Sequence, residues 1–164
     1  MTRLLATFFG LGLMRPAPGT WGSLGAVLLG WAIDRHAGFP GLFLATLAVT
    51  WAGFAACTRL LADRPGDDPS EVVIDEVAGQ WLALLLPSLA FWARGWEGWL
   101  PWPAPLAAFL FFRLFDIWKP WLVGRADARG DAVGVMLDDL WAGLLAGLAT
   151  LAAGMAWHAP LLLS

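Results

Sequence analysis

Long stretches without a single formal charge constrain the fold of this chain more than any other feature. These stretches cover residues 4–14, 16–33, 36–58, 77–93, 98–112 and 140–164. A helix needs about 20 apolar residues to cross the hydrocarbon core of a bilayer, and 36–58 and 140–164 reach that length. Because 59% of the residues are apolar and only 14% are charged, we expect the lipid bilayer to be the main solvent of this chain.

The shorter stretches shape the expected architecture. To span a bilayer, the stretches 77–93 and 98–112 must draw in interfacial residues or thin the bilayer locally; otherwise they form buried core helices. Prolines precede Ala104, which predicts that the second of these helices starts near that residue. The stretch 4–14 is too short to span. We therefore predict a single all-α domain over residues 1–164, a membrane-embedded multi-helix bundle with about five membrane spans or buried helices.

Basic residues predict the orientation of these helices. Alternate connecting segments hold eight Lys and Arg residues on one side of the membrane and two on the other; the eight are Arg3, Arg15, Arg59, Arg64, Arg113, Lys119, Arg125 and Arg129. The positive-inside rule places these eight in the cytoplasm. The same orientation puts most acidic residues on the cytoplasmic side. A net charge of -3 and scattered basic residues argue against nucleic acid as a partner.

The densest group of charges lies between residues 112 and 143, next to uncharged stretches on either side. Arg113, Asp116 and Lys119 step by three, so they are expected to share one helix face, and Pro120 makes it hard for that helix to continue. A carboxylate between two cations can bind a metal ion while the cations bind an anion such as phosphate. The alternative is a ladder of ion pairs on a solvated helix face.

A second acidic pattern, Asp-x-x-Ala-Gly, occurs at residues 75–79 and again at 139–143, each time beside another acid, Glu76 or Asp138. Carboxylates are stabilised at helix N-termini, and the small Ala and Gly allow two helices to approach closely. With Asp116, five carboxylates would repel one another unless a cation lies among them. Oxygen ligands favour Mg²⁺. Helix capping on a solvated loop explains either pair taken alone.

A loop rich in Pro and Gly at residues 15–23 precedes an apolar stretch. Its Thr20 and Ser23 can cap the following helix. Gly19 and Gly22 also let backbone N–H groups approach a phosphate at a helix N-terminus. No Lys follows the glycines, so the loop is not a Walker motif.

Other phosphatase chemistries lack their residues in this sequence. Cys57 has no neighbouring His or Gly-rich loop, both His residues map to the side opposite the acids, and no Asp-x-Asp pair occurs. These absences disfavour thiol, phosphohistidine and aspartyl mechanisms. The remaining mechanism is attack by a water that the metal has made acidic, with Arg113 and Lys119 neutralising the phosphoryl oxygens.

Four segments, residues 18–25, 74–79, 112–121 and 134–143, resemble the phosphatidylglycerophosphatase A family. The resemblance implies an Mg²⁺-dependent enzyme of phospholipid biosynthesis in the bacterial inner membrane, which hydrolyses phosphatidylglycerophosphate to phosphatidylglycerol and phosphate. It also implies a fold with one central helix surrounded by others. The catalytic and metal-binding residues it implies are Asp75, Glu76, Asp116, Asp138 and Asp139. The phosphate-binding residues it implies are Arg113 and Lys119, with Thr20 and Ser23 as secondary contacts.

The main alternative is a small membrane transporter coupled to a cation or a proton, since carboxylates within membranes often mark ion paths. Transporters bind their coupling ion near the midplane, whereas no charge falls in the middle of an apolar stretch here. A membrane adaptor without chemistry would leave the five acids without a purpose. The expected partners are therefore a phospholipid substrate and the membrane.

Overall fold

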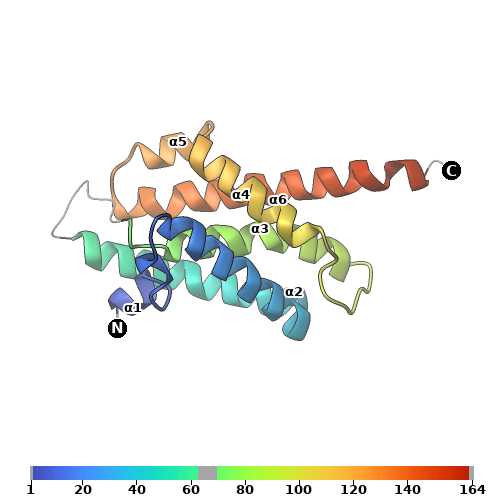
Figure 1. The fold of residues 1–164 in the computed structure, drawn as a ribbon, viewed down its shortest axis with the longest axis horizontal. Coiled ribbons are helices and arrows are strands. Elements are labelled where there is room, and N and C mark those ends of the chain that lie inside the picture. The colour runs from blue at the N-terminus through green and yellow to red at the C-terminus, as the bar shows by residue number, and fades with distance from the viewer. Residues whose placement is uncertain (1, 63–69, 163–164) are drawn as a thin grey trace.

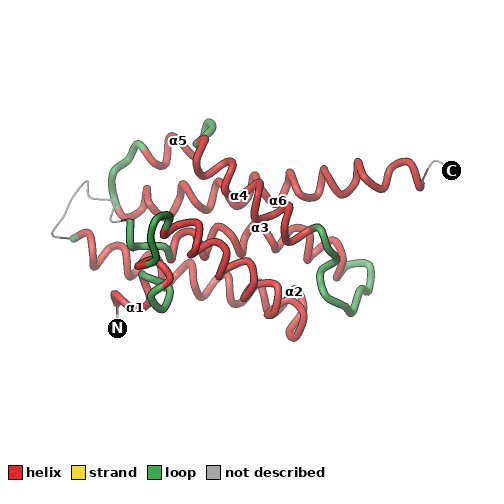
Figure 2. Tube along the Cα trace, in the orientation of Figure 1, coloured by secondary structure: helices red, strands yellow, loops and turns green. Residues whose placement is uncertain are grey.

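The computed structural model describes residues 2–62 and 70–162, and within these ranges every regular element is helical (Figure 2). The elements are α1 (Thr2–Ala6), the 3₁₀ helix η1 (Leu11–Leu13), α2 (Pro18–Leu61), α3 (Ile74–Trp92), α4 (Ala104–Trp118), α5 (Leu122–Asp127) and α6 (Ala132–Leu162). The long helices pack along the longest axis of the molecule (Figure 1). This arrangement confirms the predicted all-α bundle.

Helix α2 is interrupted at Gly38, which has φ 64° and ψ -172°. Glycine adopts a positive φ without the strain that a Cβ would cause, and Pro40 lacks the N–H that a continuous helix would need there. Figure 1 shows the chain reversing its direction at this point, so that residues 18–37 and 39–61 form two separate legs. These legs correspond to the two apolar stretches that the sequence separates at residues 34 and 35.

Helix α3 is the central helix of the bundle. Within its most apolar 18-residue window, 67% is buried, against 28% in the corresponding windows of α2 and α6. It contacts α2, α4 and α6, and its buried side chains include Val77, Trp81 and Leu84. The expectation of one central helix surrounded by others therefore holds for the described residues.

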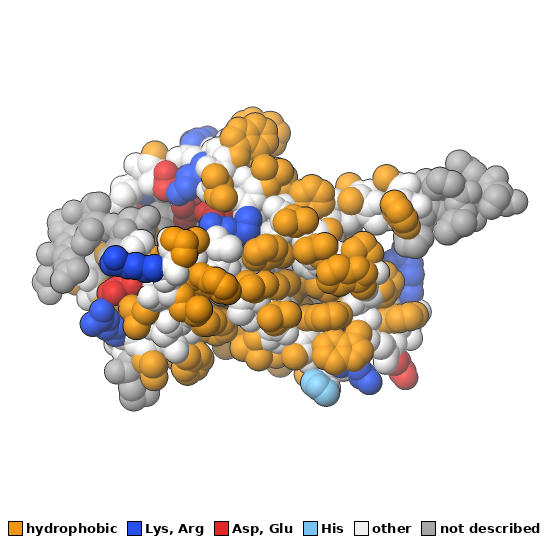
Figure 3. Space-filling model, viewed as in Figure 1, with side chains coloured by type: hydrophobic (Ala, Val, Ile, Leu, Met, Phe, Trp, Pro, Cys, Tyr) orange, Lys and Arg blue, Asp and Glu red, His pale blue; other side chains and the backbone are white. Residues whose placement is uncertain are grey.

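Three of the described helices are long and apolar enough to cross a membrane: α2, α3, and α6 up to Trp157. Helix α4 begins at Ala104, as predicted, and its 15 residues cover only about 22 Å. Apolar side chains cover much of the outer surface (Figure 3), and Leu44, Trp51 and Ile117 are among those largely exposed. Such a surface suits the hydrocarbon of a bilayer.

The order of the helices brings several helix termini together at one end of the bundle. Helices α2, α3 and α6 begin at this end and α4 ends there (Figure 1), while α5 packs on α6 beside it. Arg35 and Arg94 belong to the opposite end, near the break in α2 and the end of α3. Arg64, which the orientation prediction also counts, lies outside the described residues. The acidic motifs thus share one end of the molecule.

Candidate active site

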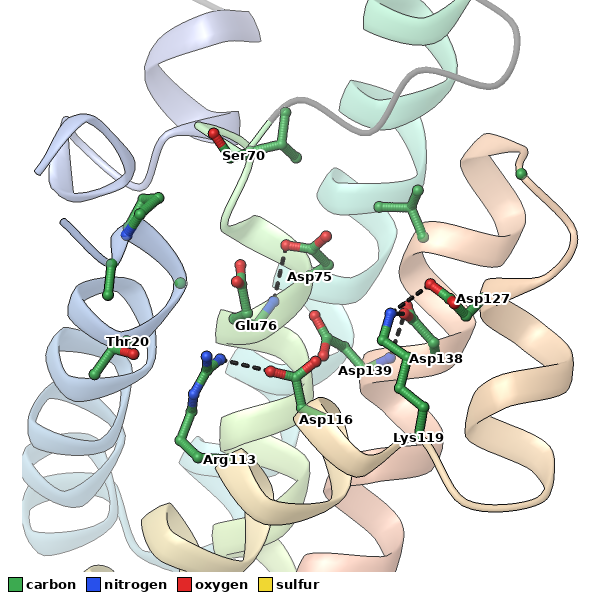
Figure 4. Close-up of a pocket in the computed structure, with 16 residues that line it drawn as sticks. Thr20, Ser70, Asp75, Glu76, Arg113, Asp116, Lys119, Asp127, Asp138 and Asp139 are labelled. Carbon is green, nitrogen blue, oxygen red and sulfur yellow. Dashed lines mark hydrogen bonds and ion pairs between the residues drawn. The ribbon is translucent and has the colours of Figure 1, made fainter. Parts of the chain in front are cut away.

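A pocket of about 400 Å³ lies where these helix termini meet. Most of the residues that line it are polar or charged, and they come from α2, α3, α4, α5, α6 and the connecting loops (Figure 4). The charged residues in the lining are Asp75, Glu76, Arg113, Asp116, Lys119, Asp127, Asp138 and Asp139. Six carboxylates face two cations, which gives the pocket an excess of negative charge when all of them are ionised.

Asp75 and Glu76 lie in the first turn of α3, where the helix dipole stabilises negative charge. Asp75 is buried, and its Oδ1 accepts a hydrogen bond of 2.9 Å from the backbone N–H of Glu76. The Glu76 side chain reaches toward α2 at Gly19, where an added Cβ would lie only 2.2 Å from Glu76 Oε1. An alanine at position 19 would therefore displace the end of the Glu76 side chain from its present position.

Asp138 and Asp139 lie about two turns inside α6, because that helix begins at Ala132. The side chain of Asp131 caps the helix by accepting the Gly134 N–H at 2.7 Å. The hydrogen bonds from Arg129 and from Gly134 lower the pKa of Asp131 below its usual value. The prediction that each acid pair starts a helix is thus right for α3 and wrong for α6, since Asp131 already supplies the cap.

Two glycines bring the acid pairs of α3 and α6 together. A Cβ added to Gly143 would lie 2.2 Å from the carbonyl oxygen of Gly79, and one added to Gly79 would lie 2.4 Å from that of Asp139. No side chain fits between backbones that approach so closely. The expectation that the small residues of the repeated motif permit helix contact is confirmed.

Helix α4 contributes Arg113 and Asp116, whose Nη1 and Oδ2 atoms are 2.6 Å apart. Lys119 does not share their helix face as the spacing predicts, because α4 ends at Trp118 and Lys119 follows in a left-handed conformation with φ 51°. Its ammonium forms ion pairs with Asp127 and, at 3.0 Å, with Asp138. Burial lowers the pKa of Lys119, but these hydrogen bonds outweigh burial and raise it above its usual value.

Three carboxylates are placed to share a metal ion. Asp75, Glu76 and Asp139 each offer an oxygen atom, and these atoms lie within 4.8 Å of one another. Glu76 Oε2 and Asp139 Oδ1 are buried and have no hydrogen-bond partner among the described residues. Buried carboxylate oxygens without partners are costly unless a cation neutralises them. An all-oxygen ligand set of this kind fits a hard ion such as Mg²⁺.

The other two predicted metal ligands line the same pocket but have cationic partners. Asp116 pairs with Arg113 and points toward Asp139, and Asp138 pairs with Lys119 (Figure 4). Each of these two carboxylates is therefore partly neutralised by a cation.

The two hydroxyl residues predicted to contact phosphate are placed differently. Thr20 lines the pocket, in the first turn of α2. Ser23 is buried, and its hydroxyl donates a 2.8 Å hydrogen bond to the carbonyl oxygen of Gly19. Ser23 is not part of the pocket lining. A side-chain bond to the preceding turn is an ordinary alternative for a serine within a helix.

Sequence reasoning missed several polar residues in or near the site, including Ser70, Asp127 and Gln80. Asp127 binds Lys119 from α5, and its only sequence signal is its place in the dense charge cluster. Gln80 follows Glu76 by one turn of α3; it is fully buried, and neither atom of its amide has a hydrogen-bond partner among the described residues. The four-residue spacing from Glu76 is the signal that could have identified Gln80.

Residues 4–154 match the family model described as phosphatidylglycerophosphatase A. A Haemophilus influenzae protein named phosphatidylglycerophosphatase A is 37% identical over 145 residues, which are 87% of this chain and 82% of that protein. The Escherichia coli protein of the same name is 33% identical, over 87% of this chain and 77% of its own length. A Bacteroides thetaiotaomicron protein with the provisional name phosphatidylinositol-3-phosphatase is 38% identical, over 86% of each chain. No solved structure matches significantly.

Proposed function

Because this chain belongs to the phosphatidylglycerophosphatase A family, we propose that it hydrolyses phosphatidylglycerophosphate to phosphatidylglycerol and phosphate, depends on Mg²⁺, and acts at the cytoplasmic edge of the bacterial inner membrane. Membership makes the chain a lipid phosphomonoester phosphatase. The metal, the side of the membrane and the role of each residue are the finer parts of the proposal.

The cluster of Asp75, Glu76 and Asp139 carries the proposal. One oxygen of each carboxylate lies within 4.8 Å of the others, and Glu76 and Asp139 each have a buried oxygen without a hydrogen-bond partner among the described residues. Arg113 lines the same pocket. A carboxylate cluster that needs a cation, next to a guanidinium that can bind an anion, matches the requirements of metal-assisted phosphate ester hydrolysis.

Asp75, Glu76 and Asp139 would hold the ion, with Asp116 and Asp138 as further candidate ligands. A bound Mg²⁺ would polarise the phosphoryl group and lower the pKa of the attacking water. Arg113 binds the phosphoryl oxygens: one of its terminal nitrogens holds Asp116, while its buried Nε has no partner among the described residues and remains a donor. Lys119 adds a second positive charge at the outer wall of the pocket.

The position of the pocket also supports the phosphatase over the transporter. Among the described residues, the acids of α3, α4 and α6 that line the pocket lie within about two turns of a helix end. Transporters instead bind their coupling ions near the midplane of the membrane. The distribution of basic residues in the sequence, eight against two, supports a cytoplasmic position for this end.

Phosphate release by the purified protein in detergent micelles tests the proposed substrate. The panel consists of phosphatidylglycerophosphate, phosphatidylinositol 3-phosphate and glycerol 3-phosphate, each supplied with Mg²⁺. We expect phosphatidylglycerophosphate to give the highest kcat/KM of the three. The inclusion of phosphatidylinositol 3-phosphate matters because one relative carries a provisional name for that activity.

The control is the Asp139→Asn variant prepared in the same way, which reveals any contaminating phosphatase. Release of phosphate from phosphatidylglycerophosphate at equal rates by both proteins would contradict the proposal. A higher kcat/KM for phosphatidylinositol 3-phosphate would contradict the substrate while leaving the lipid phosphatase class intact.

A further inference from the structure

Two exposed apolar strips lead away from the pocket, one on α2 and one on α4. On α2, Thr20 lines the pocket, and Leu24 and Leu28 follow at intervals of four residues with exposed fractions of 36% and 56%. Residues spaced in this way lie along one side of a helix. The α2 strip therefore begins at the pocket wall.

The α4 strip has the same relation to the pocket. Arg113 lines the pocket, and Leu110 and Leu106 precede it by three and seven residues, with exposed fractions of 56% and 39%. Helix α2 begins at the pocket while α4 ends there, so both strips run from the pocket toward the opposite end of the bundle. Each extends for about 10 to 12 Å, at 1.5 Å per residue.

Contacts near the far end show that the two helices that carry the strips lie side by side. Trp31 follows Leu24 by seven residues on α2, and its indole N–H donates a 2.9 Å hydrogen bond to the carbonyl oxygen of Leu100, just before α4. Helices α2 and α4 also contact each other directly. Figure 3 shows apolar side chains continuing over this face of the molecule from the charged atoms of the pocket.

We propose that the α2 and α4 strips bind the acyl chains of the phospholipid substrate, so that its phosphate enters the pocket sideways from the bilayer between Thr20 and Arg113. This inference rests on the proposed function. The occupant must be apolar along the strips and anionic at one end, since Arg113, a cation whose side chain is 18% exposed, lies where the strips meet the pocket. A phosphorylated lipid has this combination of properties.

The opposite wall of the pocket is polar and suits water instead. Lys119, Asp127 and Gly130 form part of it, and Asp127 and Gly130 are exposed. The nucleophilic water and the released phosphate therefore have a polar route on the α5 side, while the lipid product returns to the bilayer on the side of α2 and α4. The two routes do not compete for the same opening.

The test compares two substrates that share a head group: long-chain phosphatidylglycerophosphate in mixed micelles and a water-soluble dihexanoyl analogue. Leu28→Trp and Leu110→Trp add bulk to the strips outside the pocket. We expect each to raise KM for the long-chain substrate about five- to tenfold. Leu28 lies about 12 Å along its strip from Thr20, beyond the reach of a hexanoyl chain, so Leu28→Trp should leave kcat/KM for the short-chain analogue within about twofold. Leu44→Trp, at an exposed position on the second leg of α2, is the control and should change neither.

A second measurement does not depend on kinetics. A photoreactive benzoylphenylalanine placed at Leu110, and separately at Leu44, is irradiated with radiolabelled long-chain substrate. We expect excess unlabelled substrate to abolish labelling at position 110 and to leave the bulk-lipid labelling at position 44 unchanged. Equal competition at both positions, or long-chain KM values that the Trp variants leave unchanged, would overturn the proposal. Failure of the wild-type protein to hydrolyse either substrate would instead refute the proposed function.

Discussion

Lys119 connects two elements of the site through its ammonium group. It pairs with Asp127 on α5 and with Asp138 on α6, so it can either bind the substrate phosphate or only hold α5 in place. The ion pair between Lys119 and Asp127 contributes little to stability. The Asp127 side chain is 45% exposed, and exposed ion pairs are worth about 0 to 1 kcal/mol. Separate substitutions of Lys119 and Asp127 distinguish phosphate binding by Lys119 from a purely structural role.

We predict that Lys119→Met lowers kcat/KM by about 10²-fold, the usual scale for losing one charge contact with a phosphoryl group in a pocket. Asp127→Asn keeps the cation and its bond to Asp138, so we expect its kcat/KM to stay within about threefold of wild type. Steady-state kinetics on both variants makes the comparison. If Asp127→Asn were as damaging as Lys119→Met, Lys119 would act through the position of α5 rather than through its charge.

The sequence predicted well which residues line the pocket, but it predicted less well which residues pair with one another. All five predicted carboxylates, both predicted cations and Thr20 line one pocket. The spacing of three placed Lys119 beside Asp116, but the chain leaves the helix at that residue, so its partner became Asp138. Ser23 turned to a backbone carbonyl within its own helix, a choice between competing acceptors that a sequence pattern does not encode.

Contact between helices α3 and α6 depends on the two glycines of the repeated acidic motif. Gly143 faces the carbonyl oxygen of Gly79 at a distance that excludes a Cβ. The sequence predicted this contact, because small residues recur one turn after each acid pair. It did not predict where α6 begins, since the cap at Asp131 depends on the loop that precedes it.

We predict that Gly143→Ala lowers the free energy of unfolding by about 2 kcal/mol or more, because the added methyl group forces two backbones apart. Gly154→Ala is the matched control on the same helix, where an added Cβ meets no atom within 4 Å. Since alanine favours helix over glycine by up to about 1 kcal/mol, the control should be neutral or stabilising. Unfolding in detergent, followed by circular dichroism, measures both. Equal stability of the two variants would contradict the proposed role of the contact.

The molecule as a whole separates a charged end from an apolar body. The alternation of apolar stretches was enough to predict the bundle, because burial in lipid or protein requires uncharged segments of this length. The central helix was expected only from the family resemblance. The sequence placed the separation at the charged residues 34 and 35, whereas α2 continues to Gly38, where glycine tolerates the positive φ and Pro40 interrupts the helical hydrogen bonds. The side of the membrane that the charged end faces is predicted from the basic residues alone.

Labelling of single cysteines tests that orientation in a Cys57→Ala background, since Cys57 is the one native cysteine and is buried. Ala128→Cys lies in an exposed turn near the pocket, and Glu97→Cys lies in the exposed loop at the other end. In intact cells a membrane-impermeant maleimide should label position 97 and should reach position 128 only after the membrane is opened. Labelling of position 128 in intact cells would reverse the orientation.

The proposed site holds Mg²⁺ for catalysis, and a titration of phosphatase activity with Mg²⁺ tests this requirement. Purified protein is stripped with EDTA, and phosphate release from phosphatidylglycerophosphate is then measured as Mg²⁺ is restored, for wild type, Glu76→Gln and Asp139→Asn. We predict no activity in EDTA, full recovery in wild type, and, because each variant loses one carboxylate of the cluster, a loss of at least about 10²-fold in both at any Mg²⁺ concentration. Undiminished phosphate release in EDTA, or variants that respond to Mg²⁺ as wild type does, would contradict the account.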